Sequence, residues 1–412
     1  MNRRNFLRHL SFSPLAVTNV TASISLFSMV RQAYADTNKT LVVIFQRGGC
    51  DGINTIIPYG DDEYYNLRPD ISIAAPGNGS KSTIDIDGFF GFHPSLSAFQ
   101  DLYQQGNMAI FPATHYPNGN RSHFSSQDFI ESGVTKKTLS DGWLNRYLTL
   151  SNNNSFFRAV SFGGLSHSLR GSGKVSTINN LENIEKFPNT NENFRNQLSK
   201  VIHQPIDKVM HNRSLLHKEG SVMLDNLEIL PSLNYSSYTP ENGVTYPDSS
   251  YGQQLRQIAY LIKSDLQPEV ISLNHNGWDH HAKQGGTEGI QATKLSDFSQ
   301  GISALCNDLG TSKLNDVVIL TMTEFGRTAK QNASGGTDHG NASCWFAIGG
   351  SVSGGIFGNW PGLQKENLYL GRYLQQTIDY RDILTEILLV HLNSSKINTI
   401  LPNHNYQSIG FL

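Results

Sequence analysis

The amino-acid sequence predicts an α/β protein built on a mainly parallel central sheet. Short apolar runs rich in β-branched residues recur along the chain, segments with helical spacing of apolar residues lie between them, and glycine-rich polar loops follow several of the runs. Strands that alternate with helices form parallel sheets with right-handed crossovers. Ligands of such sheets bind beyond the carboxyl ends of the strands, so the residues after each strand are candidates for a functional site.

The apolar runs and the helical segments follow one another in a clear order. The first run, "TLVVIF", is continuous, as expected for a strand that is buried on both faces. The predicted strands are 40–45, 107–114, 269–274, 317–320 and 344–350. The predicted helices are 93–106, 125–133, 250–266, 294–310 and 379–392, and the first two of them end at a glycine.

The middle of the chain is more polar than the rest. Residues 151–250 are rich in Asn and Ser, with one helical stretch at 193–227. We interpret this region as a polar, partly helical insertion or cap. No internal repeat is evident.

The first 35 residues predict export. Arg3 and Arg4 stand side by side before a short apolar run, and the segment ends in Ala-Tyr-Ala, the small-x-small form of a signal-peptidase site. The arginine pair resembles a twin-arginine signal, which implies the twin-arginine export machinery as a partner and a periplasmic or secreted protein; a general secretory signal is the alternative. The mature chain, residues 36–412, would begin at Asp36 and carry no transmembrane anchor.

Composition excludes several classes of protein. The 412 residues include 38% hydrophobic residues, enough for a large core, and the net charge of −2 gives no electrostatic case for binding nucleic acid or an anionic membrane. Three widely spaced cysteines do not form a disulfide framework and allow at most one bridge within the chain. The oligomeric state is left open.

The loops after three predicted strands are rich in metal-ligand side chains. These are Asp51, then Asp279, His280 and His281, then Glu324, Asp338 and His339. Carboxylate and imidazole together suit Zn, Mn or Fe better than Ca²⁺, which prefers oxygen ligands. Taken singly, an Asp after a strand is commonly a helix cap and a lone His is commonly structural, but together the loops favour one site.

Six segments carry a resemblance to a known family. They are 42–69, 92–111, 120–133, 277–284 ("GWDHHAKQ"), 323–341 ("TEFGRTAKQNASGGTDHGN") and 349–363. They resemble the family known as domain of unknown function 1501, which is similar to the alkaline phosphatase and sulfatase superfamily. The resemblance implies a three-layer, alkaline-phosphatase-like sandwich with a mainly parallel sheet.

The resemblance also implies roles for individual residues. The implied ligands of a divalent metal, Zn before Mn, Fe or Mg, are Asp51, Asp279 with His281, Glu324 and His339. His280 is the adjacent alternative to His281. Asp338 either binds the metal or orients His339. Arg327 either holds an anionic oxygen of the substrate or pairs with a nearby carboxylate.

The nucleophile is where the chain departs from the superfamily pattern. The resemblance places a Ser, Thr or modified Cys at the start of the helix after the second strand, and Ser122 and His123 both fit that position. Ser122 could equally be only a helix cap. We expect a metal-dependent hydrolase or transferase that acts on a small-molecule or polysaccharide ester of phosphate or sulfate. The alternative is a catalytically silent envelope protein that uses the fold for assembly or polysaccharide binding.

Overall fold

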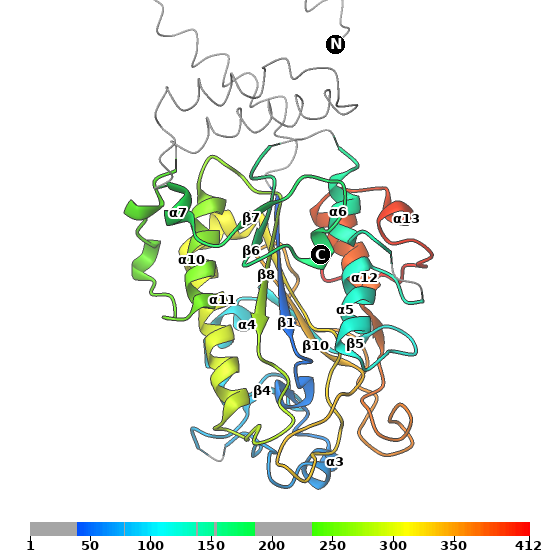
Figure 1. Cartoon of the computed structure of the whole chain (residues 1–412). Helices are drawn as coiled ribbons and strands as arrows, with labels where there is room; N and C mark the ends of the chain where they lie inside the picture. The colour runs from blue at the N-terminus through cyan, green and yellow to red at the C-terminus, as the bar shows by residue number, and fades with distance from the viewer. Residues whose placement is uncertain (1–38, 78, 137–138, 152–154, 186–232) are drawn as a thin grey trace, which may run out of the picture. The chain divides into compact units, whose positions relative to one another are not determined.

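A nine-stranded sheet forms the centre of the computed structural model, which describes residues 39–77, 79–136, 139–151, 155–185 and 233–412 (Figure 1). In spatial order the strands are β11 (Gly355–Ile356), β5 (Met108–His115), β10 (Ser343–Ile348), β9 (Val317–Met322), β1 (Thr40–Arg47), β8 (Val270–Asn276), β6 (Ala159–Phe162) and β7 (Ser176–Ile178), with β12 (Ile378–Asp379) also paired to β5. Every pairing is parallel except those that β10 makes with β5 and β9.

Strand β1 shows why its sequence is apolar throughout. It lies between β8 and β9, and its side chains alternate between two hydrophobic cores. Val42 and Ile44 face one core, whereas Leu41, Val43 and Phe45 face the other. A strand covered on both faces needs apolar residues at consecutive positions, which accounts for the continuous run in the sequence.

Helices cover both faces of the sheet. Figure 1 shows α10 and α11 on one side and α5, α6 and α12 on the other. The helices are α3 (Asp62–Leu67), α4 (Gln100–Gln104), α5 (His123–Ser132), α6 (Trp143–Leu148), α7 (Leu181–Glu185), α10 (Ser250–Lys263), α11 (Ile290–Leu314), α12 (Tyr380–Glu386) and α13 (Ile397–Ile400). Each helix layer buries its apolar side in one of the two cores. The predicted α/β class, with a mainly parallel sheet between helices, is confirmed.

Two local predictions differ from the structure. The segment 93–106 is not one α-helix, because Leu96 leaves helical geometry within a 3₁₀ helix at Pro94–Phe99, and α4 follows it. The C-terminal helix ends at Glu386 and continues as a π-helical turn at Ile387–His391. The apolar spacing indicates that a segment is buried, but it does not fix the hydrogen-bond pattern of short helical turns.

Smaller elements complete the structure. A three-stranded sheet consists of β2 (Ile56–Ile57), β4 (Gly91–Phe92) and β3 (Ile84–Asp85), and further 3₁₀ turns lie at Gly52–Asn54, His167–Leu169, Tyr235–Ser237 and Glu241–Gly243. None of the helices in the described ranges has the length and hydropathy needed to span a bilayer.

Parts of the predicted domain organisation fall outside the described residues. These are the signal segment 1–35 and the helical stretch 193–227. Within the range 151–250, where the sequence predicts an insertion, β6 and β7 extend the central sheet next to β8.

The central strands bring three loops to one edge of the sheet. The pairing of β1 with β8 extends to Arg47 and Asn276, and that of β1 with β9 extends to Phe45 and Met322. These parallel strands therefore end side by side. The loops that begin at Gly48, Gly277 and Thr323 start from the same edge, and the residues after these strand ends form the site described next.

Candidate metal site

Three histidines and one aspartate converge beyond the ends of the central strands. His123 is the first residue of α5, Asp279 and His281 follow β8, and His339 lies between β9 and β10. Ligand atoms of His123, Asp279 and His339 lie within 4.8 Å of one another, a group that could hold a metal ion. His281 belongs to the same cluster, because its Nε2 lies 3.0 Å from Nε2 of His339 and 2.9 Å from Oδ1 of Asp279.

The spacing of neighbouring ligand atoms fits metal coordination. Nε2 of His339 lies 3.4 Å from Oδ1 of Asp279, and Nε2 of His123 lies 3.5 Å from Oδ2 of the same carboxylate. Zinc binds nitrogen at roughly 2.0–2.1 Å with tetrahedral angles, which separates neighbouring ligand atoms by about 3.3 Å. The four distances from 2.9 to 3.5 Å bracket this value.

Glu324 fixes the orientation of the His123 ring. Its Oε1 lies 2.8 Å from Nδ1 of His123 and also accepts from the backbone N–H of Gly48 and the amide of Gln127, both at 2.9 Å. Burial alone would raise the pKa of Glu324, but the hydrogen bonds from His123 and Gln127 hold it below its usual value. The bond to Glu324 in turn raises the pKa of His123. Nε2 of His123 is buried and has no hydrogen-bond partner among the described residues.

The other two histidines are oriented in the same way. Nδ1 of His281 lies 3.1 Å from Oδ1 of Asp338, and Nδ1 of His339 lies 2.9 Å from the backbone carbonyl of Arg121. Carboxylate and carbonyl oxygens only accept, so each Nδ1 carries a proton and donates. In the neutral state each ring therefore presents its Nε2 lone pair to the cluster. Histidines that bind metals commonly use their second nitrogen in this manner.

The groups that face one another at the centre of the cluster are therefore all hydrogen-bond acceptors. Lone pairs on the Nε2 atoms of His123, His281 and His339 meet the carboxylate of Asp279. Such an arrangement repels itself unless extra protons or a cation lie between the groups. Asp279 and His281 are 44% and 46% exposed, so the cluster is open to solvent on their side. The chemistry of this donor set fits a divalent metal.

Arg327 connects Asp279 of the cluster to the backbone of the neighbouring loops. Its buried guanidinium donates to the carbonyl oxygens of Gly48, Gly49, Thr337 and Trp278 and to Oδ1 of Asp279 at 2.6 Å. Burial alone would raise the pKa of Asp279, but Arg327 holds it below its usual value. Of the two roles predicted for Arg327, the structure shows the pairing with a carboxylate. These bonds leave the guanidinium turned toward the protein.

The glycine pair after β1 permits this close packing. Gly48 has φ of +122°, and a Cβ there would lie 2.6 Å from the backbone nitrogen of Asp279. Gly49 has φ of +76°, and a Cβ there would lie 2.5 Å from the ring of Phe325. The Phe325 ring itself packs against the rings of His123 and His339, with centroid distances of 4.8 and 4.9 Å.

Asp51 and His280, two of the residues considered for the metal from the sequence, have other partners. The Asp51 carboxylate is buried against Arg68, which donates from both Nη atoms at 2.6 and 2.9 Å, and it accepts from Gln284 at 2.6 Å. Burial would raise the pKa of Asp51, but Arg68 lowers it. The buried His280 ring contacts Gln291 and a backbone carbonyl instead of the cluster, which leaves His281 as the member of the pair that faces it.

The region around Ser122 contains a further cation. Ser122 is exposed at the N-cap of α5, and its hydroxyl makes no hydrogen bond with the described residues. The guanidinium of the preceding Arg121 lies over the ring of Tyr373, 4.6 Å from its centroid, and forms no ion pair there. Sequence reasoning missed Arg121 and Arg68. For Arg121 the signal was its place directly before the predicted nucleophile position.

Solved structures with a similar fold include sulfatases and a member of the alkaline phosphatase superfamily. A sulfatase from Pseudoalteromonas sp. is 9% identical, with a TM-score of 0.38 and coverage of 94% of this chain and 76% of that chain. A protein in the alkaline phosphatase superfamily from Vibrio parahaemolyticus is 9% identical, with a TM-score of 0.33 and coverage of 78% and 63%. A phosphonate monoester hydrolase of Agrobacterium radiobacter is 10% identical, with a TM-score of 0.32 and coverage of 90% and 78%. Similarities of this size transfer neither substrate nor activity.

The sequence comparisons are more limited in extent. None of the curated proteins compared with the chain matches it. Residues 238–392 match the family described as "Protein of unknown function (DUF1501)", which confirms, over this part of the chain, the family resemblance predicted from the sequence.

Proposed function

We propose that the protein is an exported, metal-dependent hydrolase or transferase that acts on esters of phosphate or sulfate. The observation that carries the proposal is the convergence of three imidazole Nε2 atoms on the Asp279 carboxylate. The contacts of Asp279 with each ring and of His281 with His339 measure 2.9 to 3.5 Å, and each Nδ1 already donates to an acceptor. Export rests on the predicted signal at 1–35, and the ester class rests on the resemblance stated for the sequence.

Zinc is the metal that this donor set favours. Three nitrogen donors and one oxygen donor suit Zn²⁺, and Mn²⁺ or Fe²⁺ can use the same groups, whereas Ca²⁺ and Mg²⁺ take oxygen ligands. The proposed ligands are His123, Asp279, His281 and His339, with Glu324 and Asp338 as the carboxylates that orient two of the rings. A bound divalent metal would act as a Lewis acid toward an ester oxygen and toward water.

The chain's own residues would bind and orient the ester. Arg121 contacts His339 of the cluster through its backbone carbonyl. Its guanidinium lies over the Tyr373 ring, has no carboxylate partner among the described residues, and is suited to an anionic oxygen of the substrate. Ser122 is the proposed nucleophile, because its hydroxyl is exposed and lies at the N-terminus of α5, where the helix dipole favours developing negative charge. His123 would serve as a ligand, since Glu324 already binds its Nδ1.

A catalytically silent metal-binding envelope protein is the second candidate. One observation favours it: four protein groups are enough to fill a tetrahedral shell. Structural zinc sites are closed in this way, whereas catalytic sites keep one position open for water or substrate.

Turnover by matched histidine variants separates the two candidates. His281 and His167 have the same side-chain exposure, 46%, and each contacts a carboxylate, but His167 lies outside the cluster. If the protein is an enzyme, the zinc-supplied wild type and His167→Gln hydrolyse aryl phosphate or aryl sulfate esters, and His281→Gln loses at least about 100-fold in kcat/KM. A wild type that binds zinc but turns over none of a broad panel of esters would contradict the enzyme proposal and favour the silent protein.

A further inference from the structure

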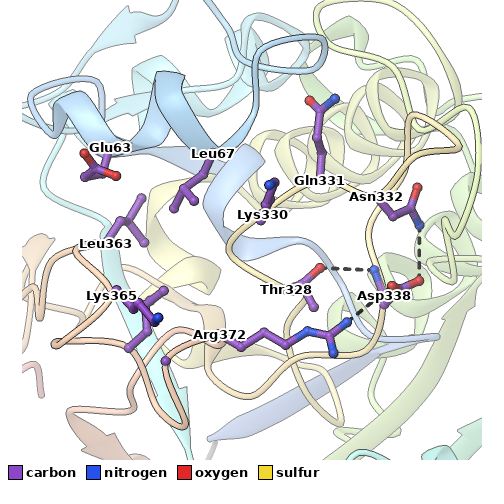
Figure 2. A pocket seen from close by; sticks show the side chains of 12 residues that line it. Glu63, Leu67, Thr328, Lys330, Gln331, Asn332, Asp338, Leu363, Lys365 and Arg372 are labelled. Atoms are coloured by element: carbon purple, nitrogen blue, oxygen red, sulfur yellow. Dashed lines mark hydrogen bonds and ion pairs between the residues drawn. The ribbon is translucent and has the colours of Figure 1, made fainter.

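A cavity of about 480 Å³ lies beside the proposed metal site. Figure 2 shows it between α3 and the loops that follow β9 and β11. Three leucines contribute apolar surface: Leu67 from α3, and Leu363 and Leu368 from the later loop. The volume is within the range of about 300–1,000 Å³ that small-molecule sites occupy.

Three cationic side chains also line the cavity: Lys330, Lys365 and Arg372 (Figure 2). The two lysines are exposed, and neither forms an ion pair with the part of the chain that the structure describes. The only carboxylates of the lining are those of Glu63 and Asp338. The lining therefore carries three positive and two negative charges, a net charge of +1.

Both carboxylates already have partners. Asp338 lies 3.1 Å from Nδ1 of His281 through Oδ1 and 3.6 Å from the guanidinium of Arg372 through Oδ2, so it compensates the charge of Arg372. Glu63 accepts a hydrogen bond from the neutral amide of Asn66 at 3.0 Å and keeps its charge. Lys330 and Lys365 form no ion pair among the described residues, and after Glu63 is counted they leave the lining with its net charge of +1. An apolar surface with unpaired ammonium groups suits a ligand that has both a ring and an oxyanion.

Asp338 connects this cavity to the proposed metal site. One carboxylate oxygen orients a proposed metal ligand, and the other faces a cation of the cavity lining. A ligand in the cavity is therefore one side chain away from His281. A substrate whose ester group lies at the metal site can extend into the cavity with a neighbouring part of the same molecule.

We propose that the cavity binds a second anionic group of the substrate. The substrate class is then a polyanionic ester, such as a saccharide with two or more sulfate or phosphate groups, in which one ester reacts and another is held by Lys330 and Lys365. The inference rests on the proposed function for the reacting ester. The cavity can be tested separately, because binding of the second anion requires no turnover.

The test measures binding of a disulfated disaccharide and its unsulfated parent by calorimetry at low salt. We expect wild-type protein to bind the disulfated compound at least about tenfold more tightly than the parent. The double variant Lys330→Gln, Lys365→Gln should lose about tenfold or more in affinity. The matched control Lys313→Gln, Lys396→Gln, which removes two exposed lysines that do not line the cavity, should bind as the wild type does.

Three results would overturn the proposal. The first is equal affinity of the cavity variant and the wild type for the disulfated disaccharide, and the second is equal affinity of the wild type for the sulfated and unsulfated disaccharides. The third is equally tight binding of inorganic sulfate, which would mean that the protein recognises a free anion. A variant of the metal site, His339→Gln, separates this proposal from the proposed function. If His339→Gln still binds the disulfated compound through the two lysines, the cavity proposal stands even where no ester is hydrolysed.

Discussion

Replacement of Glu324 by glutamine isolates the charge that supports the proposed metal site. Oε1 of Glu324 accepts from His123, Gln127 and the backbone of Gly48, while Oε2 lies 3.2 Å from the Thr323 hydroxyl. A glutamine with its carbonyl oxygen in the Oε1 position keeps the three accepted bonds, and its amide can donate to the hydroxyl oxygen. The substitution therefore removes negative charge while the shape and hydrogen-bond count are retained.

The expected effect is on metal affinity. A carboxylate that binds Nδ1 makes the imidazole a better ligand, and loss of such a partner typically weakens metal binding about 10–100-fold, or about 1.4–2.7 kcal/mol. The assay is competition for Zn²⁺ with a chromophoric chelator at fixed pH and salt. The matched control is Glu366→Gln, which removes an exposed carboxylate outside the site. A Glu324→Gln variant with a zinc Kd within about threefold of the wild type would refute the role of Glu324.

Three further predictions concern the backbone, the nucleophile and the pH dependence of stability. Gly48→Ala should lower the free energy of unfolding by about 1–3 kcal/mol and reduce the zinc content, because φ of +122° is unfavourable for alanine and the new Cβ would meet the backbone of Asp279; an unchanged melting temperature and zinc content would contradict this. If the protein turns over an ester, Ser122→Ala should retain zinc and fold but lose several orders of magnitude in kcat, whereas His123→Ala should also lose metal; intact activity in Ser122→Ala would point to another nucleophile. Burial lowers the pKa of His391 to about 4 from an ordinary value near 6.5, so the unfolded chain binds a proton between these pH values and the native chain does not. The free energy of unfolding should therefore fall as pH falls from 6.5 toward 4, by up to about 3 kcal/mol. Chemical denaturation at several pH values should show a weaker pH dependence for His391→Gln than for the wild type. The same pH dependence in both proteins would show that His391 does not contribute.

The sequence was most informative about which loops meet. Continuous apolar runs predict strands buried on both faces, and parallel strands end at one edge, so Asp279, His281 and His339 could be expected to lie near one another. The reversed direction of β10 could not be predicted, because an apolar run looks the same for a strand of either direction.

The sequence was less informative about which side-chain atoms face the centre of the cluster. Glu324 and Asp338 were predicted among the candidate ligands, and in the structure they face the Nδ1 atoms of His123 and His281. A difference of a few ångströms decides whether a carboxylate reaches a metal or the histidine in front of it, and residue spacing does not contain that distance. The environment of Asp51 was hidden for a similar reason. Its partner, Arg68, lies at the C-terminal end of α3, and the local sequence does not reveal that this end packs against Asp51.

The metal content of the purified protein tests the central claim most directly. Protein produced without chelator, and supplied with one equivalent of Zn²⁺ before gel filtration, should retain close to one zinc per chain by elemental analysis, and His339→Gln prepared in parallel should retain much less. A wild type that retains no more zinc than His339→Gln would contradict the account. It would mean that protons, and not a metal, lie between the three imidazole nitrogens and Asp279.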